Sequence, residues 1–339
     1  MPEKKKQHYV PQFHLRNFSY EQNKTHISIY NIESQTYRAS IPIKQQLQKP
    51  YFYGKDLTLD KILEENENKS SVIIEKIIEC KLLPKENSLD LGILLKFILL
   101  AKNRTLFSSD QMNEMVDKTI KQIWSKSEEH KDFMESHNFG MNNAVSLVLE
   151  QIFGMIDLFS TLKIKILNTK NNCFITSDNP VIPYNVFLEN RNHPGGHYGI
   201  NTKGIIYYFP INSKNCLLVY DSKTYRIGNR KQITIEIDSK DLLDINSITF
   251  INSYKNVYFD GSIMCESKLN DIQLNLKYVS LPNGLVLKEY LQERINDDQT
   301  STLMHQYRSN LKLNLKPSYL KITKKAKKYV IRNETVVER

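Results

Sequence analysis

The sequence predicts an α+β fold, with an N-terminal hairpin and a helical layer packed on a mixed or antiparallel β-sheet and a helical, basic C-terminus. Two patterns of apolar residues along the 339 residues support this prediction. Apolar residues spaced three and four apart dominate residues 57–161, whereas short runs rich in Ile, Val, Tyr and Phe dominate residues 162–283. No internal repeat or low-complexity linker divides the chain, so residues 1–311 should form one elaborated domain and residues 312–339 a basic tail.

The N-terminal unit, residues 1–56, should hold a short helix and a hairpin. Pro11 suits the first turn of a helix, because its missing N–H would have no partner there. Residues 27–31 and 36–42 alternate apolar and polar side chains around a turn-like Glu-Ser-Gln, which predicts two antiparallel strands.

After this unit we expect a helical layer over residues 57–161, a β-rich part over residues 162–283 and a helix over residues 284–311. Within the helical layer, the polar residues 125–142 should be an exposed excursion, and residues 189–199, rich in Pro and Gly, should form a mobile loop. Helices are predicted over residues 242–258 and 284–311. The strands, which should share one sheet, are predicted at residues 162–167, 173–176, 204–210, 216–220 and 232–237.

Composition argues against several classes of protein. The longest apolar runs contain charged residues and fall short of the roughly 20 residues of a spanning helix, so we expect no membrane span. The N-terminus lacks the apolar stretch of a secretory signal, and the four cysteines lack the spacing of a zinc site or a disulfide framework. These features predict a cytoplasmic protein with reduced, mostly buried thiols. Gly-rich phosphate loops, H-E-x-x-H helices and G-x-S-x-G elbows are also absent from the sequence.

Most of the formal charge of +10 lies at the C-terminal end of the chain. Residues 312–339 hold nine Lys or Arg against two Glu, which gives 9 − 2 = +7. Such a segment could follow the phosphate backbone of RNA or DNA, or it could be a solubilising terminus that binds nothing. The candidate nucleic-acid-binding residues are Lys321, Lys324, Lys325, Lys327, Lys328 and Arg332.

Several different short motifs follow one another along the chain. The first is His8-Tyr9-Val10-Pro11-Gln12-Phe13 with Leu15, Asn17 and Phe18, and the later ones are Tyr53-Gly54, Glu67 with Ser70 and Ser71, Arg104-Thr105, the run from Phe174 to Val181, Phe209-Pro210 and Ile251-Asn252. Over about residues 5–258 the chain resembles domain of unknown function family 4238. The resemblance implies a shared fold and a common polar site, but no reaction. His14 departs from it, because family members tend to have Tyr there.

The motif residues with reactive side chains are His8, Glu67, Arg104 and Asp178. His8 could transfer a proton, or simply fill a gap and bond a backbone carbonyl. Arg104 could bind a phosphate with two parallel hydrogen bonds, or it could pair with a carboxylate such as Glu67 or Asp178. Asp178 follows a predicted strand, where it could serve a reaction or form a structural corner. The candidate supporting residues are Gln12, Asn17, Ser177, Asn179 and Asn252.

Two hypotheses for function follow from these residues. The first is a nucleic-acid-acting phosphodiesterase or ribonuclease of a microbial defence or toxin-type system, in which His8 moves a proton and Arg104 stabilises phosphate charge. Asp178 would orient the histidine or, with Glu67, bind Mg²⁺ or Mn²⁺. The second hypothesis is a non-catalytic module that senses or binds nucleic acid or a partner protein. The oligomeric state stays open, since no long heptad pattern is present.

Overall fold

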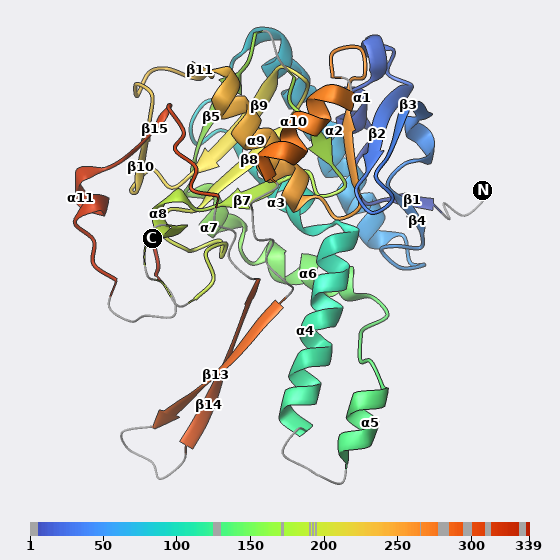
Figure 1. Cartoon of the computed structure of the whole chain (residues 1–339), viewed down its shortest axis with the longest axis vertical. Coiled ribbons are helices and arrows are strands. Elements are labelled where there is room, and N and C mark those ends of the chain that lie inside the picture. Colours follow the sequence, from blue (N-terminus) through green and yellow to red (C-terminus); the bar gives the residue numbers. More distant parts are fainter. Residues whose placement is uncertain are drawn as a thin grey trace.

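The computed structural model is an α+β protein built around two β-sheets, as predicted (Figure 1). It describes residues 6–124, 130–170, 173–189, 191, 193, 195–264, 266–276, 285–293, 300–308, 313–331 and 337–339. A five-stranded sheet has the strand order β11-β5-β9-β8-β7, and a four-stranded sheet has the order β3-β2-β12-β6.

The five-stranded sheet forms the centre of the hydrophobic core. Every residue of its two central strands, β8 and β9, is buried. Helices of the layer cover one face, and the N-terminal motif, residues 242–248 and the C-terminal part of the chain cover the other. Alternate residues point to opposite faces. Tyr207 and Leu217 therefore contribute to one hydrophobic cluster, and Tyr208 and Leu218 to another. All pairings are antiparallel except that of β11 with β5, and the strands are β5 (Lys163–Asn168), β7 (Ile182–Tyr184), β8 (Ile206–Pro210), β9 (Asn215–Tyr220) and β11 (Thr234–Glu236).

The four-stranded sheet contains the predicted hairpin, β2 (His26–Asn31) and β3 (Thr36–Pro42). Two expectations about this region were wrong. Within the predicted strand 173–176, only Thr176 enters a strand, β6 (Thr176–Ser177), and it pairs with β12 (Asn256–Phe259) rather than with the other predicted strands. The predicted helix 242–258 ends early, because β12 fills the gap between β2 and β6 and takes up the hydrogen bonds of both.

The helical layer predicted for residues 57–161 is confirmed. Its longest members are α2 (Thr58–Cys80), α3 (Leu89–Asn103) and α4 (Leu106–Trp124). Ser88 caps α3 by accepting a hydrogen bond from the Leu91 N–H, and the helix is buried almost all round against α2, α7 and the central sheet. The shorter helices of the described chain are α1 (Gln12–Arg16), α5 (Lys131–Ser136), α6 (Ala144–Phe153), α7 (Ile156–Ser160), α8 (Val186–Glu189), α9 (Ser239–Asn252) and α10 (Glu266–Leu276).

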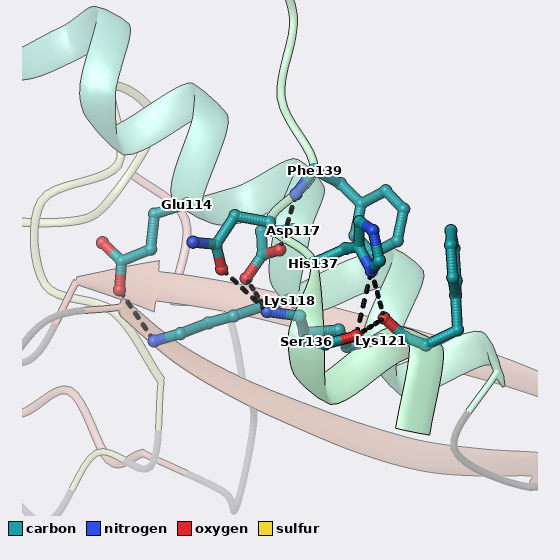
Figure 2. Close-up of polar contacts among 9 residues, drawn as sticks. Glu114, Asp117, Lys118, Lys121, Ser136, His137 and Phe139 are labelled. Carbon is teal, nitrogen blue, oxygen red and sulfur yellow. Dashed lines mark hydrogen bonds and ion pairs between the residues drawn. The ribbon is translucent and has the colours of Figure 1, made fainter. Parts of the chain in front are cut away.

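The polar excursion after α4 returns along that helix. Figure 2 shows the contacts that hold it: Asp117 accepts a hydrogen bond of 2.9 Å from the Phe139 N–H and pairs with Lys121 at 2.9 Å. Lys118 pairs with Glu114 one turn away at 2.7 Å. The two ion pairs lie within α4, are exposed or half-exposed and are worth only about 0.3–0.5 kcal/mol each, so the returning segment is held by the bond from Phe139 to Asp117.

The predicted helix over residues 284–311 is wrong. The described residues there form an antiparallel hairpin, β13 (Leu285–Glu293) with β14 (Thr300–Arg308). The spacing of Leu285, Leu287 and Leu291 fits the period of a strand as well as that of a helix, and the pairing of the two segments decides between the two. In Figure 1 this hairpin projects from the two sheets alongside α4.

The basic tail is not a free appendage. We call residues 313–331 and 337–339 the C-terminal strap. Its strand β15 (Leu320–Ile322) pairs with β10 (Tyr225–Ile227), and a single helical turn follows, α11 (Lys324–Lys327). Its apolar side chains Leu315, Tyr319, Ala326 and Val337 are buried in the main hydrophobic cluster. Because the strap completes the core, the expected helical C-terminus is corrected to one short turn in an otherwise extended segment.

The strap is also held by buried carboxylates of the domain. Glu189 accepts hydrogen bonds of 2.6 Å from the N–H groups of Leu313 and Asn314, and burial raises the pKa of its carboxyl group. Asp241 accepts a bond of 3.0 Å from the Ser318 N–H. The loop that follows Glu189 is less exposed than its composition suggested, since His193 and His197 are both buried.

Two compositional expectations can be compared with the described chain. Cys80, Cys173 and Cys216 are free thiols, of which the last two are buried, while Cys265 lies outside the described residues. None of the helices described is both long and apolar enough to cross a membrane.

Candidate functional site

The motif at the N-terminus meets the helical layer at Arg104, which follows the last residue of α3. Its guanidinium group is 3% exposed and uses all three nitrogens. Nε donates to the Tyr53 hydroxyl at 2.9 Å, Nη2 donates to the His8 carbonyl oxygen at 2.8 Å, and Nη1 pairs with the Glu67 carboxylate at 2.5 Å. The Tyr53 hydroxyl donates in turn to the same His8 carbonyl oxygen at 3.1 Å.

The electrostatics of Arg104 fit a structural anchor. Burial opposes the charge of the guanidinium, but Tyr53 and Glu67 outweigh burial and raise the pKa of Arg104 above its ordinary value. Of the partners considered from the sequence, the structure selects Glu67. Because the side chain is 3% exposed and three of its five N–H groups already have acceptors inside the protein, a phosphate could reach Arg104 only if the surrounding groups moved.

His8 contributes its main chain to this network rather than its ring. The half-buried imidazole has its Nε2 3.1 Å from the Gln12 amide nitrogen and 3.4 Å from the Lys44 carbonyl oxygen. The Gln12 amide oxygen accepts a bond of 3.1 Å from Arg16, so the supporting residue Gln12 links the ring to α1. Asn17, also predicted as supporting, is the C-cap residue that follows α1.

Gln7 is the residue of this region that the sequence did not single out. It is 1% exposed, accepts a hydrogen bond of 2.7 Å from the Tyr53 N–H and donates to the Gly54 carbonyl at 3.3 Å. β1 (Lys6–His8) pairs with β4 (Gln48–Pro50), and Gln7 extends that pairing to the turn after β4. A buried glutamine directly before His8 gives no signal in sequence, because glutamine is ordinarily exposed.

Asp178 forms a separate structural corner. Its carboxylate is 4% exposed and accepts three backbone hydrogen bonds, from Tyr254 at 2.8 Å, from Lys255 at 2.7 Å and from Asn256 at 2.9 Å. Burial raises the pKa of Asp178 to about 6, against the three N–H groups, which lower it. The carboxylate shapes the turn between α9 and β12, and in the described chain it is hydrogen bonded to none of His8, Glu67 and Arg104.

Asn179 and Asn252 lock the same corner reciprocally. The Asn179 amide donates to the Asn252 carbonyl at 3.0 Å, and the Asn252 amide donates to the Asn179 carbonyl at 3.3 Å. The Ser177 hydroxyl accepts from the Asn179 N–H at 3.1 Å. Both asparagines also line a cavity of about 270 Å³ between this corner and α4. Ser177, Asn179 and Asn252, which were predicted as supporting residues, therefore lie together at this corner.

A possible Mg²⁺ or Mn²⁺ site on Asp178 and Glu67 gains no further ligands. Among the residues that the structure describes, no group of three or more His, Cys, Asp or Glu is placed to hold a metal ion. Asp178 and Glu67 themselves are engaged by different partners, three backbone N–H groups and Arg104.

The lysines predicted to bind nucleic acid are exposed on the strap. Lys321 lies directly opposite Arg226 in the pairing of β15 with β10, and α11 buries only Ala326 while its lysines face outward. Thr323 bonds to the Lys223 carbonyl at 3.0 Å, which brings one more exposed lysine to this place. We call the group the basic ridge: Lys223, Arg226, Lys321, Lys324, Lys325, Lys327 and Lys328. Arg332, the remaining predicted residue, lies outside the described residues.

The comparison with known proteins agrees with this distribution of motifs. No curated protein and no solved structure matches the chain significantly. A family model described as "Protein of unknown function (DUF4238)" matches residues 6–262, well over half of the chain. The matched segment contains both sheets, the Arg104 network and the Asp178 corner, and it ends before β13 and the strap. The chain therefore belongs to the DUF4238 family.

Proposed function

We propose that this protein is a non-catalytic nucleic-acid-binding module whose basic ridge contacts the phosphate backbone. The observation that carries the proposal is the pairing of Lys321 with Arg226 as direct neighbours on an exposed face. Like charges directly opposite each other on paired strands are destabilising, so a polyanion that neutralises both would be bound with a gain in free energy.

The surroundings of the ridge support this reading. No acidic residue occurs between 313 and 331, and in the described chain no ion pair involves a ridge residue. Figure 1 shows β10, β15 and α11 together on one side of the molecule, away from α4. Seven cationic side chains on adjoining elements match the repeated negative charge of a nucleic acid better than they match a small ligand.

We prefer a non-catalytic function to a catalytic one because the side chains of Glu67, Arg104 and Asp178 already bind other groups of the protein. A general acid or base needs a ring within reach of substrate, and a phosphate clamp needs nitrogens available to it. Arg104 instead pairs with Glu67, Tyr53 and the His8 carbonyl, and Asp178 is occupied by backbone N–H groups. The phosphodiesterase hypothesis depends on those same groups, so it has less support from the geometry.

The test is binding of fluorescent duplex and single-stranded RNA and DNA to the full chain across a range of salt concentrations. The dissociation constant should rise steeply with salt, with a logarithmic slope of about 0.9 per duplex phosphate contacted. Changing Lys324, Lys325, Lys327 and Lys328 to Gln should weaken binding and reduce that slope. Substitution is preferable to deletion of the tail, because the strap supplies buried residues to the core.

A matched control removes the same charge elsewhere. Lys49, Lys61, Lys76 and Lys85 are exposed and lie far from the strap in sequence, and their replacement by Gln should leave the slope closer to that of the wild type. Equal loss in both quadruple variants would show that only net charge matters and would overturn the assignment. Cleavage of the same probes with Mg²⁺ or Mn²⁺, abolished by His8→Ala, would instead support the phosphodiesterase hypothesis.

A further inference from the structure

We infer that the cavity between α4 and the Asp178 corner is a binding site for a nucleobase that carries an exocyclic amino group. This site is independent of the basic ridge. It lies within residues 102–252, inside the family-matched segment, whereas the ridge lysines of the strap lie beyond that segment.

The cavity has the size and lining of a site for a small planar ligand. Its volume of about 270 Å³ lies just below the roughly 300–1,000 Å³ of pockets that hold drug-sized molecules. Met112 and Val148 provide apolar surface, and Phe107 and Tyr198 provide two aromatic rings. Aromatic and thioether side chains favour flat, polarisable heterocycles.

Three buried asparagines give the cavity its polar character: Asn103, Asn179 and Asn252, at 8%, 3% and 6% exposure. Each amide nitrogen donates to a backbone carbonyl, which can only accept, so the orientation of each amide is fixed. For Asn103 the partner is the Leu99 carbonyl at 2.8 Å. The amide oxygens therefore face away from the partner carbonyls.

Two of those oxygens determine what the ligand must offer. In the described chain, the Oδ1 atoms of Asn103 and Asn179 accept no hydrogen bond, although both side chains are buried at the cavity. These oxygens open onto the cavity, where water can donate to them in the free protein, and a ligand that displaces this water has to supply the donor itself. Adenine, cytosine and guanine carry an exocyclic amine that donates, whereas uracil and hypoxanthine carry a carbonyl at the corresponding position of cytosine or adenine.

The charges of the lining favour a base over a charged metabolite. Among the described residues that line the cavity, Lys102 is the only one with a formal charge, and no carboxylate is present. A neutral heterocycle suits the amide and aromatic surfaces, and one ammonium group is compatible with the phosphate of a nucleotide. The base could belong to a free nucleotide or to a nucleic-acid strand, and both sources present the same edge.

The experiment compares matched pairs of ligands by calorimetry on the full chain. Adenosine should bind more tightly than inosine, and cytidine more tightly than uridine, in each case by about tenfold, because the carbonyl analogue leaves a buried acceptor without a donor. Oligodeoxyadenylate and oligodeoxyinosinate, with AMP as competitor, then separate the two sources. Binding of the free nucleoside identifies a nucleotide site, and binding of the strand alone identifies a base taken from a nucleic acid.

Two variants test the cavity by different routes. Asn103→Leu removes one acceptor, and Met115→Trp fills the space without changing any asparagine. Both should abolish the preference for amino-bearing bases while cooperative thermal unfolding is retained, which shows that the variants are folded. Asn68→Ala, an exposed asparagine on α2, is the control and should change nothing. Equal affinity for adenosine and inosine, or an undiminished preference in both cavity variants, would overturn the inference.

Discussion

The buried Arg104 and the half-buried Glu67 form an ion pair of 2.5 Å that joins the end of α3 to the middle of α2. The same guanidinium holds the His8 carbonyl at 2.8 Å, so one side chain connects the N-terminal motif to two helices of the layer. A buried ion pair is costly to break, because the remaining partner keeps its charge without compensation. The pair therefore makes the motif a structural joint of the domain.

Arg104→Ala should lower the free energy of unfolding by about 3 kcal/mol, because Glu67 loses its cationic partner and the His8 carbonyl loses one of its two donors. Arg104→Lys should restore only part of it, since one ammonium group cannot reproduce three directed contacts. Denaturant unfolding measures both. Arg38→Ala, at an exposed position on β3, serves as the control. A wild-type midpoint for Arg104→Ala would contradict the anchoring role.

Asp178→Ala should destabilise the protein by at least about 2 kcal/mol, because three backbone N–H groups at the turn before β12 lose a charged acceptor. Thermal unfolding at neutral pH measures the effect, with Asp132→Ala on the exposed helix α5 for comparison. A catalytic carboxylate can often be removed with unchanged or higher stability. An unchanged melting temperature would therefore favour a role in chemistry over the structural corner.

His14 should make the stability of the fold depend on acid. Complete burial lowers the pKa of His14 to about 3, from its ordinary 6.5. Because the folded pKa lies below the unfolded one, the unfolded chain binds the proton first. The stabilisation is complete above pH 6.5 and falls by up to about 1.4 kcal/mol per unit as pH drops from 6.5 toward 3.

The variant His14→Phe isolates this contribution. Phenylalanine can keep the stacking on Phe209, whose ring lies 5.0 Å away, but it loses the 2.8 Å hydrogen bond to Thr176. At pH 7 it should cost about 1 kcal/mol. When both are followed by urea unfolding, this difference should vanish as pH falls below 6.5 and change sign by pH 5, because the wild type loses about 2 kcal/mol over that range and the variant does not. A constant difference would mean that His14 does not titrate as expected.

Truncation of residues 337–339 should lower the free energy of unfolding by at least about 2 kcal/mol through the loss of buried Val337 alone. Arg339 adds hydrogen bonds from its guanidinium to Thr161 at 2.6 Å and to the Ile200 carbonyl at 3.2 Å. Val330→Ala, at a residue of the same strap that is 73% exposed, should have little effect. Equal melting temperatures for the truncated and full chains would show that the strap end is dispensable.

The parts of the fold that the sequence predicted well are those with local signals. The alternation in residues 27–31 and 36–42 defined the hairpin, and the helical spacing defined α2 and α3. The hairpin β13–β14 and the division of the strands between two sheets were missed, because both depend on pairing between segments distant in sequence or ambiguous in period. The identity of a strand's neighbours is not encoded in its own residues.

By itself, the sequence determined the α+β class, the family motifs and the exposed lysines of the tail. Only the tertiary structure decided what the motif residues contact: Arg104 meets Glu67 and the carbonyl of His8, while Asp178 meets the backbone of Tyr254 to Asn256. Residue type gives the capacity to form a hydrogen bond, but the folded chain selects the partner, and burial then determines whether that capacity remains for a ligand. Arg104 and Asp178 form their hydrogen bonds within the protein, whereas Asn103 and Asn179 at the cavity keep an amide oxygen that can accept a hydrogen bond from a ligand.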